Sequence, residues 1–449
     1  MIAQTFDEVF SPQWIQTHLI NPTHDLIILR QLIPWQPIID GLVPFYNLNK
    51  GRTGCDLRTL SAISILARFN LFSDRKVIEQ IQENRYMQYF CNVPDQGLLT
   101  FMNPSTLCRF RQRLGQKGAA IIEDKVFTRL KRAGVINADM MLMDTTVLES
   151  PIIYPTDVRL LYKAFDKMAI VATKGKMEIW WDRAHLKTQW RAYHLDRKNP
   201  GAHLGPFYDL FKPALQGLKA RLDLLPDEPK RQSKKSGKTE NPLKTQWREL
   251  IETLTILGKQ TQQKLTGQLH IANRLVSLDD LDARPIKKGK SHPSTEFGTM
   301  LQLTFNRQGF MITTENFIGK PDDKTLYPPT LQLFRKRMGT YPGGAITDQG
   351  FRSAKNRKLD QEKMDYIFMG KSSDVDETHQ ETARSARSVT EGFIAVAKNL
   401  RGFGQSLYRG LEGAQIWTLL NQCTYNLKKF LQLYRDEALS EETLMILHL

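Results

Sequence analysis

The sequence predicts a mixed α/β protein, with a helical N-terminal part, a mixed-sheet core and a basic, mainly helical insertion after the first strand of that core. Three observations support this. Residues 1–135 carry apolar side chains at helical spacing, strand-like runs occur at 140–148 and again beyond 296, and the intervening segment carries most of the net charge. With 449 residues, 41% of them hydrophobic, the chain is long enough for several domains.

Cysteine usage and hydropathy limit the class of protein. The four cysteines, Cys55, Cys91, Cys108 and Cys423, include no Cys-x-x-Cys pair, which argues against structural zinc and fits a reducing cytoplasm. No apolar run approaches the roughly eighteen residues of a membrane span, and the first residues lack the basic segment of a signal peptide. We therefore expect a cytoplasmic protein without a membrane partner.

The first 135 residues are expected to form a helical DNA-binding domain. Apolar side chains at helical spacing predict a helix over 56–70, and Ser73 is a suitable N-cap for a second helix. A third helix carries Arg109 and Arg113 on one face and is expected to stop at Gly115. Short helices ending in an arginine-bearing helix are typical of helix-turn-helix DNA readers. An ordinary solvated face on a helical bundle is the alternative.

The sheet core is expected to comprise residues 136–157 and 291–449, including a closing helix that packs on it. Residues 140–148 form a buried strand by their composition. The next strands are expected at 300–305 and 309–314, paired as a hairpin, and at 344–347 and 364–369. Helices are expected at 158–170, with Asp157 as its cap, at 330–338 and at 382–400.

The insertion, residues 158–290, is expected to bind a polyanion. It holds 27 Lys and Arg against 14 Asp and Glu, so 13 of the net +16 charges lie there. It also holds four of the seven tryptophans, interleaved with Lys and Arg residues, and a linker expected near 226–243. Such a mixture suits stacking on unpaired bases and pairing with phosphates, whereas a helical subdomain with a tryptophan core is an equal alternative. The candidate DNA-contact residues here are Trp180, Trp181, Arg183, Lys187, Trp190 and Arg191.

Arg387, Glu391 and Lys398 lie at offsets of four and seven, so a helix would place them on one face. A carboxylate between two cations suits Mg²⁺-assisted attack on a phosphodiester, because the acid can hold the metal and the cations can hold phosphate oxygens. Asp144 in the first strand and Asp348 after the strand at 344–347 complete a candidate Asp-Asp-Glu metal site.

Each acid has a plainer interpretation. An unpaired carboxylate in the buried run around Asp144 would be costly, so this residue is either a ligand or part of an ion pair. Asp348 precedes a glycine and could simply form a turn, and Glu391 alone would be a surface residue. Asp322, Asp323 and Asp374 are weaker candidates in expected loops.

These residues resemble the DDE transposases of bacterial insertion sequences, in the branch with a Tyr-x-x-Arg-x-x-x-Glu-x-x-x-x-x-x-Lys signature. Arg387, Glu391 and Lys398 match that pattern, whereas Arg384 stands at the Tyr position. The run Thr347-Asp348-Gln349-Gly350-Phe351 resembles the second-Asp motif, and the run from Asp144 to Val147 resembles the first-Asp strand. Gly51-Arg52 and Ser105-Thr106-Leu107 resemble parts of the N-terminal domain. The resemblance covers about residues 45–160 and 290–430 and leaves the insertion largely unmatched.

The resemblance implies a ribonuclease H-like catalytic core, which the expected order of strand, hairpin, helix, strand, strand and helix fits. It implies Mg²⁺, for which Mn²⁺ can substitute, held by Asp144, Asp348 and Glu391. DNA phosphates would be held by Arg384, Arg387 and Lys398. The implied partners are the terminal inverted repeats, target DNA and further copies of the chain, as a homodimer or larger oligomer on DNA. The implied location is the bacterial cytoplasm, at the nucleoid.

A cut-and-paste transposase would cleave its ends and join the 3′-hydroxyl to target DNA. A structure-specific nuclease that never joins strands is a second interpretation. A domesticated DNA-binding protein is a third, although the presence of all three acids argues against catalytic decay. A basic scaffold that binds RNA or a membrane is a more distant interpretation.

Overall fold

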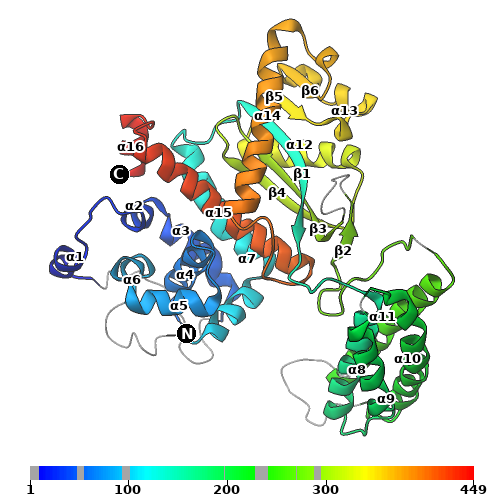
Figure 1. The fold of residues 1–449 in the computed structure, drawn as a ribbon. Coiled ribbons are helices and arrows are strands. Elements are labelled where there is room, and N and C mark those ends of the chain that lie inside the picture. Colours follow the sequence, from blue (N-terminus) through cyan, green and yellow to red (C-terminus); the bar gives the residue numbers. More distant parts are fainter. Residues whose placement is uncertain are drawn as a thin grey trace. The chain divides into compact units, whose positions relative to one another are not determined.

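The computed structural model describes residues 10–47, 55–93, 102–196, 198–227, 241–268, 270–287 and 295–449. The chain forms two compact units, one of Met1–Pro151 with Thr299–Leu449 and the other of Ile152–Gly298 (Figure 1). The expected linker near 226–243 lies mostly outside the described residues, as does the Gly51-Arg52 motif.

The N-terminal residues form short helices, as expected. Ser73 caps α5 by accepting a hydrogen bond from the Lys76 backbone, as its sequence position predicts. The third helix ends at Gly115, as expected: α7 consists of two helices that meet at this residue, whose backbone is non-helical with φ of 55°. The helices are α1 (Pro12–His18), α2 (Asp25–Leu32), α3 (Trp35–Leu42), η1 (Val43–Phe45), α4 (Leu57–Phe69), α5 (Asp74–Glu83), α6 (Arg85–Cys91) and α7 (Pro104–Arg132).

A mixed sheet forms the centre of the first unit. Its strands are β1 (Met140–Glu149), β3 (Glu296–Phe305), β4 (Met311–Ile318), β5 (Gly344–Thr347) and β6 (Tyr366–Met369). β3 and β4 form the expected antiparallel hairpin, whereas β1 pairs with β5 and β5 with β6 in parallel. The strand order is therefore β4-β3-β1-β5-β6, with β2 (Arg284–Ile286) pairing with the first residues of β3.

Helices and short turns complete this unit. α12 begins before the expected residue 330, and α14 begins before residue 382, because Asp322 and Asp376 cap them with side-chain hydrogen bonds. The elements are α12 (Asp323–Met338), η3 (Gln349–Phe351), α13 (Ala354–Lys358), η4 (Gln361–Lys363), η5 (Ser372–Asp374), α14 (Glu377–Leu400), α15 (Gly410–Arg435) and α16 (Glu441–Leu447).

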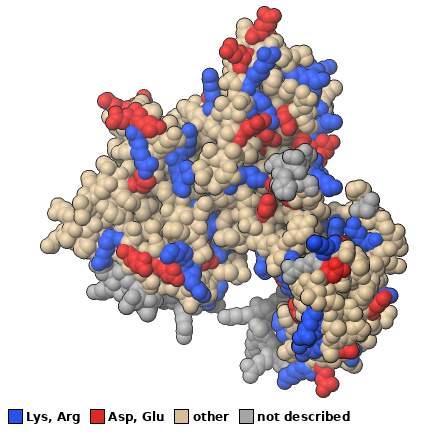
Figure 2. Space-filling model, in the orientation of Figure 1, with Lys and Arg blue, Asp and Glu red and all other residues tan. Residues whose placement is uncertain are grey.

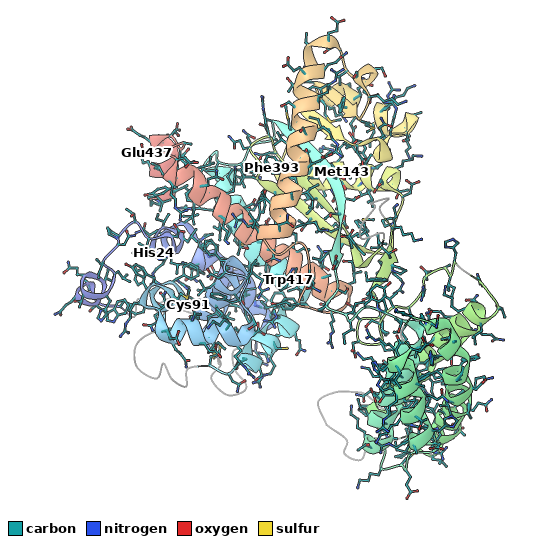
Figure 3. All side chains as sticks on the ribbon, viewed as in Figure 1. His24, Cys91, Met143, Phe393, Trp417 and Glu437 are labelled. Atoms are coloured by element: carbon teal, nitrogen blue, oxygen red, sulfur yellow. The ribbon has the colours of Figure 1, made fainter. Side chains whose placement is uncertain are left out.

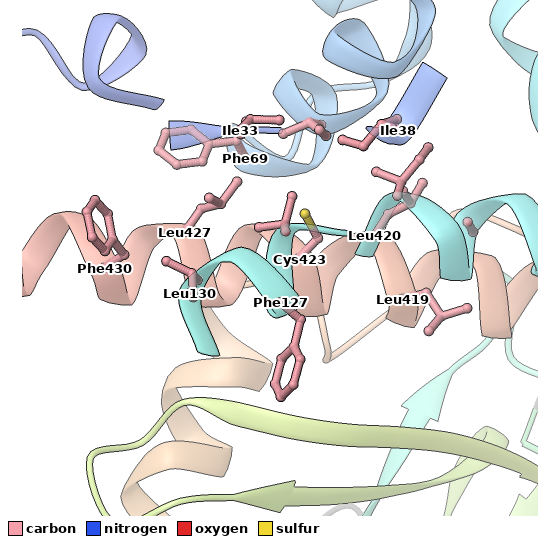
Figure 4. Close-up of a cluster of buried hydrophobic side chains, with 14 of the residues drawn as sticks. Ile33, Ile38, Phe69, Phe127, Leu130, Leu419, Leu420, Cys423, Leu427 and Phe430 are labelled. Atoms are coloured by element: carbon pink, nitrogen blue, oxygen red, sulfur yellow. The ribbon is translucent and has the colours of Figure 1, made fainter. Parts of the chain in front are cut away.

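The N-terminal helices and the sheet share one hydrophobic core, although residues 1–135 were expected as a domain of their own. Side chains of α15, including Leu420 and Leu427, meet those of α7, such as Phe127, and those of the N-terminal helices (Figure 4). α15 is buried on nearly all sides between residues 414 and 427, so it cannot pack on the sheet alone.

α15 also bonds to the backbone of β4, which has β3 as its strand partner. The Met311 backbone donates to Oδ1 of Asn426 (2.8 Å), and Nε2 of Gln422 donates to the carbonyl of Ile312 (3.0 Å). Amide side chains thus satisfy polar groups at the edge of the sheet. The sequence predicted apolar packing only.

The second unit is a helical bundle with a core of its own. It contains α8 (Asp157–Lys174), α9 (Arg183–Leu195), α10 (Pro200–Leu222) and α11 (Pro242–Leu265), and the insertion expected at 158–290 lies within it. Thr156, not Asp157, caps α8, because its hydroxyl accepts from the Arg159 backbone while Asp157 pairs with Arg274.

Candidate functional site

Two of the three predicted acids belong to neighbouring strands: Asp144 lies in β1, and Asp348 directly follows β5. Met140 pairs with Gly344 and Leu142 with Ile346 in this parallel ladder. Asp144 and Asp348 each lie two residues beyond the last of these pairs, Leu142 and Ile346. The two acids therefore follow paired residues of adjacent inner strands, which lie about 4.8 Å apart in a sheet. Oδ1 of Asp348 accepts a hydrogen bond from the Gly350 backbone (2.9 Å), which is the turn-forming interaction considered as an alternative.

Arg387 links the third predicted acid to the first. α14 packs against β1 and β5, and the labelled Phe393 and Met143 mark this helix and strand in Figure 3. Nη1 of Arg387 lies 3.2 Å from Oδ2 of Asp144, and Nη2 lies 3.5 Å from Oε1 of Glu391. The Asp144 side chain is 13% exposed and that of Glu391 is 72% exposed. One guanidinium therefore balances a sheltered carboxylate and an exposed one.

Asp323, at the first turn of α12, belongs to the same region. Its Oδ1 accepts from the Thr145 hydroxyl (3.2 Å), next in sequence to Asp144. A methyl group built on Gly350 would lie 3.0 Å from Oδ2 of Asp323 and 3.0 Å from Oδ1 of Asp348, so these oxygens lie within twice that distance. The sequence offered Asp323 only as a weak loop candidate. The sequence signal that could have identified Asp323 as a stronger candidate is the pair Asp322-Asp323 at the start of a helix.

The donor chemistry of this region fits a hard divalent cation, because Mg²⁺ prefers carboxylate oxygens. Asp144 and Asp348 belong to adjacent inner strands, and Asp323 and Asp348 both have an oxygen beside Gly350. Glu391 is turned toward Arg387. Across the described ranges, no three His, Cys, Asp or Glu side chains are grouped closely enough to enclose a metal ion.

The other two cations of the signature, both on α14, differ in burial. Lys398 is partly buried, two turns beyond Glu391. Arg384 is exposed and donates to the Ser372 hydroxyl (2.6 Å) and to Oε1 of Gln380 (3.3 Å). Arg384 is thus tied to η5, which follows β6.

In the N-terminal helices, both predicted arginines are exposed on α7 before its kink. Arg109 donates to the backbone and hydroxyl of Ser105, and the guanidinium of Arg113 lies 4.5 Å from the ring centre of Tyr46. Neither pairs with a carboxylate within the part of the chain that the structure describes. Both guanidinium groups can therefore face a phosphate.

The tryptophans of the insertion pack within the helical unit. Trp180 donates to the carbonyl of Ala214 (2.7 Å), and Trp190 stacks on Tyr162 with ring centres 4.0 Å apart. Trp181 packs against Phe165 in the same cluster. All three indoles are partly buried and pack against the core of the helical unit, as the core interpretation predicts, and each keeps an exposed part.

The bases of α9 lie on the other side of the helix. Arg183, Lys187 and Arg191 are exposed at intervals of four residues, whereas Leu186 and Tyr193 are buried. None of the three bases has a hydrogen-bond or ion-pair partner among the described residues. Lys and Arg side chains stand out on the surface of this unit (Figure 2).

Comparison with known proteins addresses the helical N-terminal part directly. Residues 15–113 match the family model "Transposase domain (DUF772)". A protein of Rhizobium meliloti, "Uncharacterized protein ORF8 in nfe locus", is 30% identical over 166 residues, which cover 36% of this chain and 79% of that protein. The chain belongs to a transposase family. No solved structure matches it.

Transposase-family membership identifies a DNA-processing protein. The residues matched by the family model run from within α1 to the start of α7, include Arg109 and Arg113, and end before Asp144. Within the described ranges, no single helix is long and apolar enough to cross a membrane. α2 and the α3–η1 segment meet that criterion only when joined across a 59° bend.

Proposed function

We propose that this chain is a DDE transposase of an insertion sequence, which cuts the ends of its element and joins each freed 3′-hydroxyl to target DNA. The observation that supports the proposal is the parallel pairing of β1 with β5, in which Asp144 and Asp348 each follow a paired residue, Leu142 and Ile346, by two positions. α14, which carries Glu391, packs against these same two strands. Two acids on adjacent parallel strands and a third on the covering helix suit metal-assisted phosphoryl transfer.

The sheet supports a ribonuclease H-like core as part of this proposal. The hairpin β3–β4 lies on one side of β1, and the parallel strands β5 and β6 lie on the other. Along the chain, β1, the hairpin β3–β4, α12, β5, β6 and α14 follow the expected order of strand, hairpin, helix, strand, strand and helix.

Asp144, Asp348 and Glu391 would hold Mg²⁺ or Mn²⁺. When bound, such ions supply activation of the attacking oxygen and neutralisation of charge on the leaving oxygen. Glu391 joins the other two acids when its exposed side chain turns away from Arg387. Arg387 then keeps its ion pair with Asp144 and directs its second amino group toward a DNA phosphate, while Lys398 holds another. Arg384 serves the same purpose at the Tyr position.

DNA would also bind two further surfaces. The exposed bases of α9 form a row of cations whose spacing suits a phosphate backbone, a sequence-independent interaction. Arg109 and Arg113 would contact the terminal inverted repeats. Because each insertion sequence has two ends, we infer that two or more copies of the chain act together on DNA.

Cleavage and joining assays test the proposal. The substrates are duplexes carrying the inverted repeats that flank the gene, incubated with Mg²⁺ and a target plasmid. Joined products support a transposase, and cutting without joining indicates the nuclease alternative. Binding without either product, under Mg²⁺ and Mn²⁺, would leave only the domesticated DNA-binding protein.

A further inference from the structure

A cavity of about 510 Å³ lies against the C-terminal part of α14 in the first unit. Phe69, Phe393 and Tyr425 supply aromatic surface, and Arg401, Lys428 and Lys429 supply positive charge. None of these residues belongs to the acid site described above. Arg401 directly follows α14, three residues after Lys398.

The cavity has more cations than its acids can balance. Asp25 is the acid in its lining, and it pairs with Arg435. Arg401, Lys428 and Lys429 have no carboxylate partner among the described residues. Nζ of Lys428 instead lies 4.7 Å from the ring centre of Phe69. Contact with an aromatic ring stabilises a cation less than pairing with an anion does.

This arrangement of cations is unfavourable when no anion is bound. Burial, and then the positive charge of Arg401, lower the pKa of Lys428 to about 8, although Asp25 opposes the change. Burial also lowers the pKa of Arg401. Partly buried cations that repel each other, and that the already paired Asp25 does not balance, would be stabilised by a bound anion.

We propose that this cavity binds a phosphodiester group of DNA, with Arg401 and Lys428 binding phosphate oxygens and the aromatic side chains packing on the attached sugar or base. Charge-assisted hydrogen bonds from Arg and Lys are the strongest that phosphate can accept, and aromatic side chains accept any base. The choice of DNA as the source of the phosphate rests on the proposed function. The cavity would hold DNA at a distance from the acids, along the helix that carries Glu391.

Protection of Lys428 from acetylation tests this assignment on the unmodified protein. The full chain is treated with an amine-reactive acetylating reagent at pH 8, and modification is quantified by mass spectrometry with exposed Lys336 as the internal reference. Duplex DNA should slow acetylation of Lys428 several-fold relative to Lys336. An unchanged ratio would overturn the proposal. Protection by inorganic phosphate but not by DNA would assign the cavity to a small anion and overturn the choice of DNA.

A charge-matched pair of variants gives a second test. Arg401→Gln with Lys428→Gln should weaken duplex binding and reduce its dependence on salt concentration, by about 0.9 in the logarithmic slope for each phosphate that is no longer neutralised. Lys117→Gln with Lys336→Gln removes the same charge from exposed positions and should leave the slope unchanged. Equal slopes for the two pairs would contradict the cavity assignment. Both tests measure binding, so they remain informative if the chain does not cut DNA.

Discussion

Asp144 on β1 and Arg387 on α14 form an ion pair, with 3.2 Å between Oδ2 and Nη1, that joins the central strand to its covering helix. Nη1 is buried and makes no well-oriented hydrogen bond, so the interaction is mainly electrostatic. The same guanidinium reaches Glu391, and these three residues therefore respond to one another.

Replacing Asp144 separates catalysis from binding. Asp144→Asn should reduce end cleavage on the order of 10³-fold or more, because a neutral amide is a poor ligand for a divalent cation. Duplex affinity, measured by fluorescence anisotropy, should change little, since this side chain is 13% exposed. Retained Mg²⁺-dependent cutting would refute the assigned role.

Arg387→Ala should destabilise the protein, because it leaves the sheltered carboxylate of Asp144 without this partner. The expected loss is about 1–3 kcal/mol in the free energy of unfolding, measured by urea denaturation. In the double variant with Asp144→Asn the loss should be smaller than the sum of the single effects. Strict additivity would show that the two side chains do not interact in solution.

Asp323→Asn should raise the Mg²⁺ concentration needed for half-maximal cleavage, on the order of tenfold, because it removes a negative charge beside Asp348. The neighbouring Asp322→Asn is the control: it removes the same charge, and Asn can keep the cap to the Lys324 backbone, so the metal requirement should not change. Equal metal requirements for the two variants would exclude Asp323 from the site.

Replacement of the exposed α9 residues by Gln should weaken binding to all duplexes alike; these residues are Arg183, Lys187 and Arg191. The logarithmic salt dependence of the affinity should fall by about 0.9 for each phosphate that these side chains neutralise in the unmodified protein.

The control removes three other exposed lysines of the same unit, Lys176, Lys219 and Lys259. If both triple variants lower the salt dependence equally, overall charge rather than the α9 surface governs binding.

Lys428 should make stability depend on pH. Its pKa of about 8 in the folded state lies below the ordinary 10.5, so the folded protein is penalised while the amine is charged. Lys428→Gln should therefore stabilise the protein at pH 7, by about 1 kcal/mol after allowance for solvent screening of this partly exposed group. The difference from the unmodified protein should shrink as pH rises from 8 toward 10.5. Urea denaturation across this range measures it, and a constant difference would argue against the lowered pKa.

Local patterns in the sequence determined many elements of secondary structure. The strand at 344–347, the start of the strand at Met140 and the cap at Ser73 agree with the structure. These features depend on neighbouring residues, because side-chain alternation, helical spacing and capping act over a few positions. The spacing of Arg387 and Glu391 on one helix face was predictable for the same reason.

The tertiary structure decided what these patterns left open. It brought Asp323 to Thr145, packed the indoles of the insertion against a helical core, and placed amide side chains of α15 on β4. Each of these interactions joins residues far apart in the chain, and packing of the whole unit selects among many pairings that local preference leaves equal. The sequence alone therefore named the acids and their helix and strands, whereas the folded sheet decided that the strand of Asp144 pairs with the strand that precedes Asp348.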